Sequence, residues 1–130
     1  MIDYEGRLVE ARRIEAGGSD VAEVTVKPDS VTEPECDELL AEMTEVMRKV
    51  SPRLAIGCGR LLHISSAMLG TLIRVRNRAH ESGGGITLFS LPAEVQSVIV
   101  LTRLDAVFPI ADTAADAIEA LAGDAGQARG

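Results

Sequence analysis

The twelve residues Leu61–Leu72 constrain the fold more than any other part of the chain, because they mark the passage from a strand to a helix. An apolar run that is typical of a buried strand ends near Arg60, and an amphipathic helix is predicted to begin at the pair Ser65–Ser66. A helix N-terminus has free backbone N–H groups and the positive end of the helix dipole. The two serines are therefore expected where a negative group such as a phosphate would be stabilised.

The hydrophobic periodicity of the rest of the chain predicts several further elements. Strands are expected over residues 7–13, 20–27, 53–58 and 86–89, with a last extended piece over 107–110. Helices are expected over residues 33–50, 65–82, 92–102 and 113–121. Helices that follow strands in this order predict crossover connections and a mostly parallel sheet with helices packed on it.

The predicted helix ends carry recognisable capping residues. Thr32 is expected to cap the helix over 33–50, and Glu35 follows at the spacing of a capping box. Ser65 is the natural cap of the next helix, which places Ser66 at the first helical position with its side chain exposed. Gly83–Gly85 then supplies the left-handed stop and the turn.

Composition and charge exclude several classes of partner. The formal net charge is −7, and the aromatic residues are one Tyr, two Phe and no Trp, so nucleic acid is not expected as a partner. The N-terminus has no basic segment followed by an apolar stretch, and the apolar runs are too short to span a bilayer. We expect a cytoplasmic protein without membrane insertion, with one domain over 1–122 and a disordered tail over 123–130.

Residues that could support catalysis do not converge in the sequence. His63 and His80 fall in different predicted elements, and the glycine clusters lack the spacing and the lysine of a phosphate-binding loop. Cys36 and Cys58 have no Cys or His at metal-ligand spacing and are interpreted as reduced, apolar residues. We therefore expect no catalytic residues, no metal and no cofactor, and a role other than that of an enzyme.

The serine pair allows two interpretations. A Ser-Ser before an apolar helix is most often a simple N-cap. A phosphate on Ser66 would instead meet the free N–H groups of the first turn and add close to two negative charges to a small, neutral surface. A partner packed on that surface would then be expelled, which is a mechanism for a switch.

The segment from His63 to Leu72 resembles the signature of the STAS family, the anti-sigma factor antagonists, whose usual pattern is Ile-Asp-Ser-Ser/Thr-Gly-Leu-Gly before an apolar helix. The resemblance continues through the basic helix Arg74–Arg78, residues 88–95 and residues 101–110, and covers residues 20 to 122. It implies an α/β fold of STAS type, a single domain with a mixed, largely parallel sheet of roughly four to five strands packed against about four helices.

The resemblance also implies a function by partner switching. In the family, an anti-sigma factor with serine kinase activity phosphorylates the first serine of the signature, the unphosphorylated form binds that kinase, and a phosphatase resets the cycle. That serine aligns with Ser66, while Ser65 is the helix cap and the alternative phosphorylation site. The partner-binding residues are expected to be Met68, Leu69 and Gly70, together with Asp29 and Ser30 of the 27–32 loop.

Three positions depart from the family pattern. Ser65 stands where the family has Asp, Ala67 replaces its second Ser or Thr, and Met68 replaces its Gly. Met68 either rebuilds the partner interface or packs inward. A second hypothesis is a STAS module that never carries phosphate, as a scaffold in a signalling assembly or an accessory subunit of a lipid-transport ATPase complex. The missing Asp favours this second hypothesis, and the retained Ser66 leaves it open.

Overall fold

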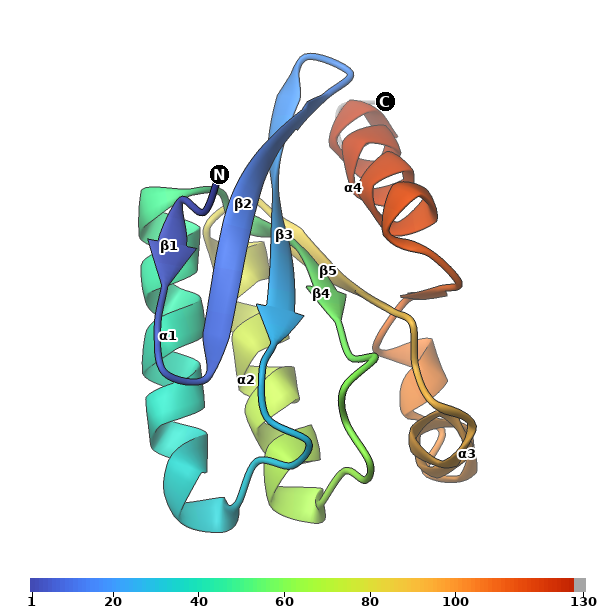
Figure 1. Ribbon diagram of the computed structural model, residues 1–130. Helices are drawn as coiled ribbons and strands as arrows, with labels where there is room; N and C mark the ends of the chain where they lie inside the picture. Colours follow the sequence, from blue (N-terminus) through green and yellow to red (C-terminus); the bar gives the residue numbers. More distant parts are fainter. Residues whose placement is uncertain (128–130) are drawn as a thin grey trace.

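The strands of the chain form one mixed sheet between two layers of helices (Figure 1). The computed structural model describes the backbone of residues 1–127 and the side chains of residues 1–122. The six strands lie side by side in the order of the sequence: β1 (Tyr4–Glu5), β2 (Val9–Ala16), β3 (Ser19–Val26), β4 (Arg53–Gly57), β5 (Gly85–Phe89) and β6 (Ile110–Ala111). Strands β1 to β3 pair antiparallel and β3 to β6 pair parallel.

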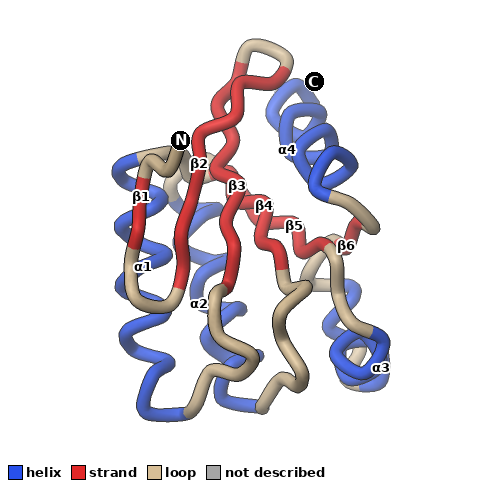
Figure 2. The backbone as a smooth tube through the Cα atoms, viewed as in Figure 1, coloured by secondary structure: helices blue, strands red, loops and turns tan. Residues whose placement is uncertain are grey.

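Each parallel strand is joined to the next by a helical crossover, as the order of the elements predicted. The helices are α1 (Cys36–Lys49), α2 (Ser66–Glu81), α3 (Ala93–Leu101) and α4 (Ala114–Gln127), with short 3-10 helices η1 (Glu33–Glu35) and η2 (Leu104–Ala106). Helices α1 and α2 cover one face of the sheet, α4 lies on the opposite face, and α3 lies beyond the carboxyl ends of the parallel strands (Figure 2). The predicted α/β fold class is confirmed.

Alternation along the strands divides the buried side chains between the two faces. On β3, Ala22, Val24 and Val26 point into the main core under α1 and α2, whereas Val21 points to the other face. The residues of the smaller core under α4 are Val21, Ala55, Phe89, Ala117 and Leu121. A parallel sheet buried on both faces explains why β4 and β5 are almost continuously apolar.

Most predicted boundaries agree with the structure to within a few residues. The predicted stop after α2 is confirmed, because Gly83 has φ 84° and its N–H donates to the carbonyl of His80 at 3.0 Å. Thr113 caps α4 through a hydrogen bond from the N–H of Asp116 to its hydroxyl at 3.1 Å. The helix runs on to Gln127, so its expected end at residue 121 was too early. Residues 128–130 of the expected tail lie outside the described residues.

Two strands differ from the sequence prediction. Strand β1 was not predicted, because this two-residue edge strand forms only by pairing with Ala11 and Glu10 of β2. The extended piece expected over 107–110 is wrong in its first part. The N–H groups of Val107 and Phe108 both donate to the carbonyl of Leu104 and form a turn, and only Ile110 and Ala111 pair with β5. The sheet therefore has six strands, two of them short edges, instead of four to five.

Candidate functional site

The candidate site lies where the parallel strands end and α1 and α2 begin. The loop after β3 (27–32) and the loop after β4 (58–65) meet there, because the N–H of Leu62 donates to the carbonyl of Asp29 at 2.8 Å. Both loops lie at the bottom of Figure 1, beside the first turns of the two helices. Ligand and partner sites on open α/β sheets favour this carboxyl end.

The serine pair is positioned by the start of α2. Ser65 is extended (φ −93°, ψ 164°), and its hydroxyl accepts a hydrogen bond from the N–H of Met68 at 3.1 Å, so it is the N-cap that the sequence predicted. Its carbonyl accepts from the N–H of Leu69 at 2.9 Å. Ser66 is the first residue of α2 and is exposed, as predicted. The hydroxyl of Ser66 is thus available at the positive end of a helix dipole.

Ser66 lies between two shallow surface hollows that separate the first turns of α1 and α2. The lining of the first hollow is Ser30, Val31, Thr32, Glu33, His63, Ser65, Ser66 and Ala67. The lining of the second is Glu33, Cys36, Asp37, Ser66, Ala67, Gly70, Thr71 and Arg74. Ser66 and Glu33 border both hollows, and Asp37 and Arg74 border the second. The surface beside Ser66 is therefore acidic on the α1 side and carries the cation of Arg74 about two turns along α2.

The structure divides the residues that were predicted to contact a partner. Gly70 and Asp29 are exposed and Ser30 is half-buried, so all three reach the surface of the site. Met68 is fully buried at 0% exposure and Leu69 is buried at 7%, so the expectation that these two form the exposed rim is wrong. Met68 falls on the stripe of α2 that faces the main core, and the alternative of inward packing is the one observed.

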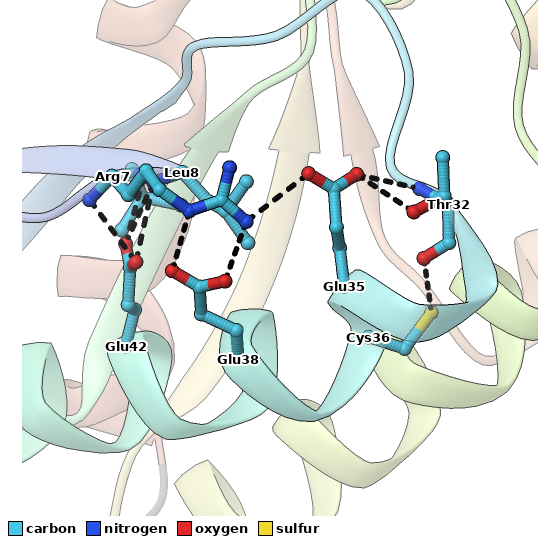
Figure 3. A network of polar contacts seen from close by, with 8 residues as sticks. Arg7, Leu8, Thr32, Glu35, Cys36, Glu38 and Glu42 are labelled. Carbon is cyan, nitrogen blue, oxygen red and sulfur yellow. Dashed lines mark hydrogen bonds and ion pairs between the residues drawn. The ribbon is translucent and has the colours of Figure 1, made fainter.

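A polar network holds the beginning of α1 beside this site (Figure 3). The predicted pairing of Thr32 with Glu35 is confirmed, because one carboxylate oxygen of Glu35 accepts from both the N–H and the hydroxyl of Thr32 at 2.9 Å. The other oxygen accepts from Arg7 Nη2 at 3.1 Å, and Arg7 Nε donates to Glu38 at 2.8 Å. Hydrogen bonds from Thr32 and Arg7 lower the pKa of Glu35, and those from Arg7 lower the pKa of Glu38.

Sequence reasoning missed the part played by Arg7. This side chain comes from the turn between β1 and β2 and reaches α1 across 28 and 31 residues of sequence. Capping patterns are local and could identify Thr32 with Glu35, whereas nothing in the spacing of residues connects Arg7 with either glutamate. The ion pairs of Arg7 therefore connect the β1–β2 turn to the beginning of α1.

The remaining candidate residues are the two histidines and the two cysteines. His63 is exposed beside Ser65, whereas His80 lies near the far end of α2. Burial raises the pKa of the Cys58 thiol to about 12, so this thiol stays protonated at neutral pH. Among residues 1–122, whose side chains are described, no three His, Cys, Asp or Glu side chains are grouped to hold a metal ion. Within residues 1–127, none of the helices has the length and hydropathy needed to cross a bilayer.

Comparisons with known proteins agree with the geometry of the fold. A search of curated protein sequences found no match. A solved structure from Thermotoga maritima, described as an anti-sigma factor antagonist, is similar with a TM-score of 0.67 and 23% identity, over 76% of this chain and 86% of that one. An anti-sigma factor antagonist from Mycobacterium paratuberculosis is similar with a TM-score of 0.65 and 20% identity, over 87% and 93% of the two chains.

A third structure and a family model extend the comparison. An anti-sigma-factor antagonist (STAS) domain protein from Planctomyces limnophilus has a TM-score of 0.65 and 21% identity, over 85% of this chain and 96% of that one. The family model of the STAS domain matches residues 20–117, which run from the second residue of β3 past β6 and include the serine pair. The protein therefore belongs to the STAS domain family.

Proposed function

We propose that this protein is an anti-sigma factor antagonist that acts by partner switching, with Ser66 as its phosphorylated residue. The observation that carries the proposal is the exposed side chain of Ser66 at the first position of α2, next to a cap supplied by Ser65. The family membership and the names of the similar structures support the same function. The chemistry belongs to the partner, and this chain is its substrate.

A phosphate on Ser66 would change the site in two ways. The N–H groups at the start of α2 and the helix dipole would stabilise its charge, so phosphorylation would not unfold the helix. Glu33 and Asp37 already border the same surface, and close to two further negative charges would make it strongly acidic. A partner that packs against the small hydroxyl would then lose contact area and meet a charged, hydrated group.

The proposed contact surface, here called the switch surface, consists of Asp29, Ser30, Glu33, Ser66 and Gly70. Its members come from the loop after β3, from η1 and from the first turns of α2. Gly70 has no side chain, and nothing lies within 4 Å of the position that a Cβ atom would take there. The surface beside Ser66 is therefore open. A protein kinase can therefore approach the Ser66 hydroxyl along the exposed side of α2.

The partner that we propose is an anti-sigma factor with serine kinase activity, and a phosphatase would reverse the modification. Incubation of the protein with such a kinase and ATP should place one phosphate on Ser66, as located by mass spectrometry of peptides. Ser66→Ala should abolish the modification, and Ser66→Asp should weaken binding to the kinase at least about tenfold, as expected for a buried charge without a partner.

Ser82→Asp is the matched control, because it adds the same charge at the other end of α2. This variant should bind the kinase as the unmodified protein does. Modification at a residue other than Ser65 or Ser66, or equal binding by Ser66→Asp and Ser82→Asp, would contradict the proposal. A stable complex whose formation is unaffected by ATP and by Ser66→Ala would instead support the second hypothesis, a STAS scaffold or transporter subunit that carries no phosphate. The presence of Ser65 in place of the family's Asp favours that hypothesis.

A further inference from the structure

A pocket with a basic polar lining lies at the end of the parallel strands that is opposite to Ser66. It has a volume of about 380 Å³, with Arg53, Arg76 and His80 among its lining residues. The chain as a whole carries a net charge of −7, yet no acidic side chain is among the described residues that line this pocket. The volume falls in the range of pockets that bind small molecules.

Two elements bring the basic side chains together. Arg53 is the first residue of β4, and Arg76 and His80 lie one turn apart on the same side of α2. Arg76 is oriented by two hydrogen bonds, from Nε to the carbonyl of Val107 at 3.1 Å and from Nη1 to Asn77 at 3.1 Å. Neither bond uses Nη2, so the guanidinium is held in place with donors still available to a ligand.

The charges of these arginines are not neutralised by a carboxylate of the described chain. The ion pairs found among the side chains of residues 1–122 engage Arg7, Arg12, Arg13, Lys27, Arg48 and Lys49. Arg53 and Arg76 are not among them. Both guanidinium groups can therefore donate to an anion without first leaving a carboxylate among residues 1–122.

The open edge of β5 adds a backbone donor. In a parallel ladder, successive residues point their N–H groups to opposite sides of the strand. The N–H of Gly85 donates to Pro52 on the β4 side, and the N–H of Leu88 donates to Pro109 on the β6 side. The N–H of Ile86 therefore points to the β6 side as well, before β6 begins at Ile110. Ile86 lines the pocket.

The glycine turn after α2 makes this arrangement possible. A Cβ atom on Gly84 would lie 2.1 Å from the carbonyl oxygen of Pro52, so only glycine allows the turn to pack this closely against the residue before Arg53. At Gly85 the corresponding position is 3.7 Å from Nε2 of His80. The turn thus brings the start of β4 beside the end of α2.

One effect opposes anion binding here, because the pocket lies near the negative end of the α2 dipole. The last turn of α2 is capped, however: the carbonyls of Ala79 and His80 accept hydrogen bonds from Gly84 and Gly83 at 2.8 and 3.0 Å. Two guanidinium groups in direct contact with a ligand outweigh the partial charge of a single capped helix end.

We propose that this pocket binds a small phosphate monoester with an apolar body. Arg53, Arg76, His80 and the N–H of Ile86 contact the phosphate. The organic part packs against the apolar residues of the lining, which are Ile86, Val107, Pro109 and Leu121. The inference does not rest on partner switching, since the pocket and Ser66 lie at opposite ends of α2.

Titration of the full chain with phenyl phosphate, followed by amide NMR shifts, tests the site. Saturable shifts are expected at Ile86 and at the amides of Gly83–Gly85, with the Ser66 amide unmoved. Inorganic phosphate should bind at least about tenfold more weakly, because it lacks the apolar body. Equal affinity for the two probes, or shifts spread over the whole surface without saturation, would overturn the proposal.

Variants separate a built site from general attraction to positive charge. Arg53→Gln should weaken phenyl phosphate binding at least about tenfold, as expected for loss of a charged hydrogen bond. Arg78→Gln is the control, because it also removes one positive charge, but from a side chain on α2 that faces α1, where Nη1 donates to Thr44 at 3.0 Å. This variant should bind phenyl phosphate as the parent does. His80→Gln, at an exposed residue, provides a second test if Arg53→Gln does not fold. Equal losses in the pocket variant and Arg78→Gln would refute the site.

Discussion

At the scale of single residues, Glu42 shows how one buried charge can hold a strand turn in place. Its carboxylate is 8% exposed and accepts hydrogen bonds from three successive N–H groups, those of Arg7, Leu8 and Val9, at 3.0 to 3.2 Å (Figure 3). One carboxylate thus satisfies the buried N–H groups of Leu8 and Val9 and the partly buried N–H group of Arg7. Together with the ion pairs of Arg7, this side chain holds the turn before β2 on α1.

The substitution Glu42→Gln tests this role. It replaces one acceptor oxygen by an NH2 group, which is a donor and would face the backbone N–H donors of the turn. We therefore expect the free energy of unfolding to fall by about 2 to 3 kcal/mol. Urea denaturation at neutral pH measures the loss. Glu38→Gln, on the same helix but with its side chain at 40% exposure, is the control and should lose much less. Similar losses in the two variants would show that the buried hydrogen bonds of Glu42 contribute no more than a surface contact.

At the scale of elements, α2 depends on its cap more than on its first residue. Ser65→Ala removes the hydrogen bond from the N–H of Met68, and loss of an N-cap costs about 1 kcal/mol. Ser66→Ala changes an exposed side chain and should leave stability within about 0.5 kcal/mol of the parent. Thermal unfolding of the two variants under identical conditions makes the comparison. A larger loss from Ser66→Ala than from Ser65→Ala would mean that Ser66 supports the fold, which its proposed role in switching does not require.

At the scale of the whole molecule, ion pairs between the β1–β2 turn and α1 make stability depend on pH. Hydrogen bonds from Thr32 and Arg7 lower the pKa of Glu35, and those from Arg7 lower the pKa of Glu38, relative to the unfolded chain. A carboxyl group with a depressed pKa stabilises the fold at pH values above its unfolded pKa of about 4.5. That contribution is lost as the pH falls through the lower pKa of the folded state.

We therefore expect the free energy of unfolding to decrease as the pH is lowered from 5 towards 3, and Arg7→Gln to reduce this slope. Urea denaturation at a series of pH values measures both. Arg60→Gln removes the same charge from an exposed loop position outside the network, and its slope should match that of the parent. An Arg7→Gln slope that equals the parent slope would mean that Arg7 does not contribute to the lowered pKa of these glutamates.

Local patterns in the sequence were sufficient to locate most helices and strands. The polar start of α1 at Thr32 and Glu35, the cap of α2 at Ser65 and the stop at Gly83 each depend on residues within one turn, and all three agree with the structure. The alternation of strands and helices indicated a parallel sheet, because helical crossovers connect parallel strands. The exposed position of Ser66 followed from its place in the first turn.

Packing between distant segments decided the rest. The two-residue strands β1 and β6 exist only because longer strands pair with them, and Met68 is buried because its face of α2 lies on the sheet. The contacts of Arg7 and Glu42 join segments about thirty residues apart or more, a separation on which no local spacing rule acts. Short-range hydrogen bonding and periodicity are encoded along the chain itself, so the sequence alone determined the longer helices and strands and the position of the serine pair. The face that each side chain shows to a neighbour depends on how the layers dock, so only the tertiary structure decided which residues reach the switch surface and the basic pocket.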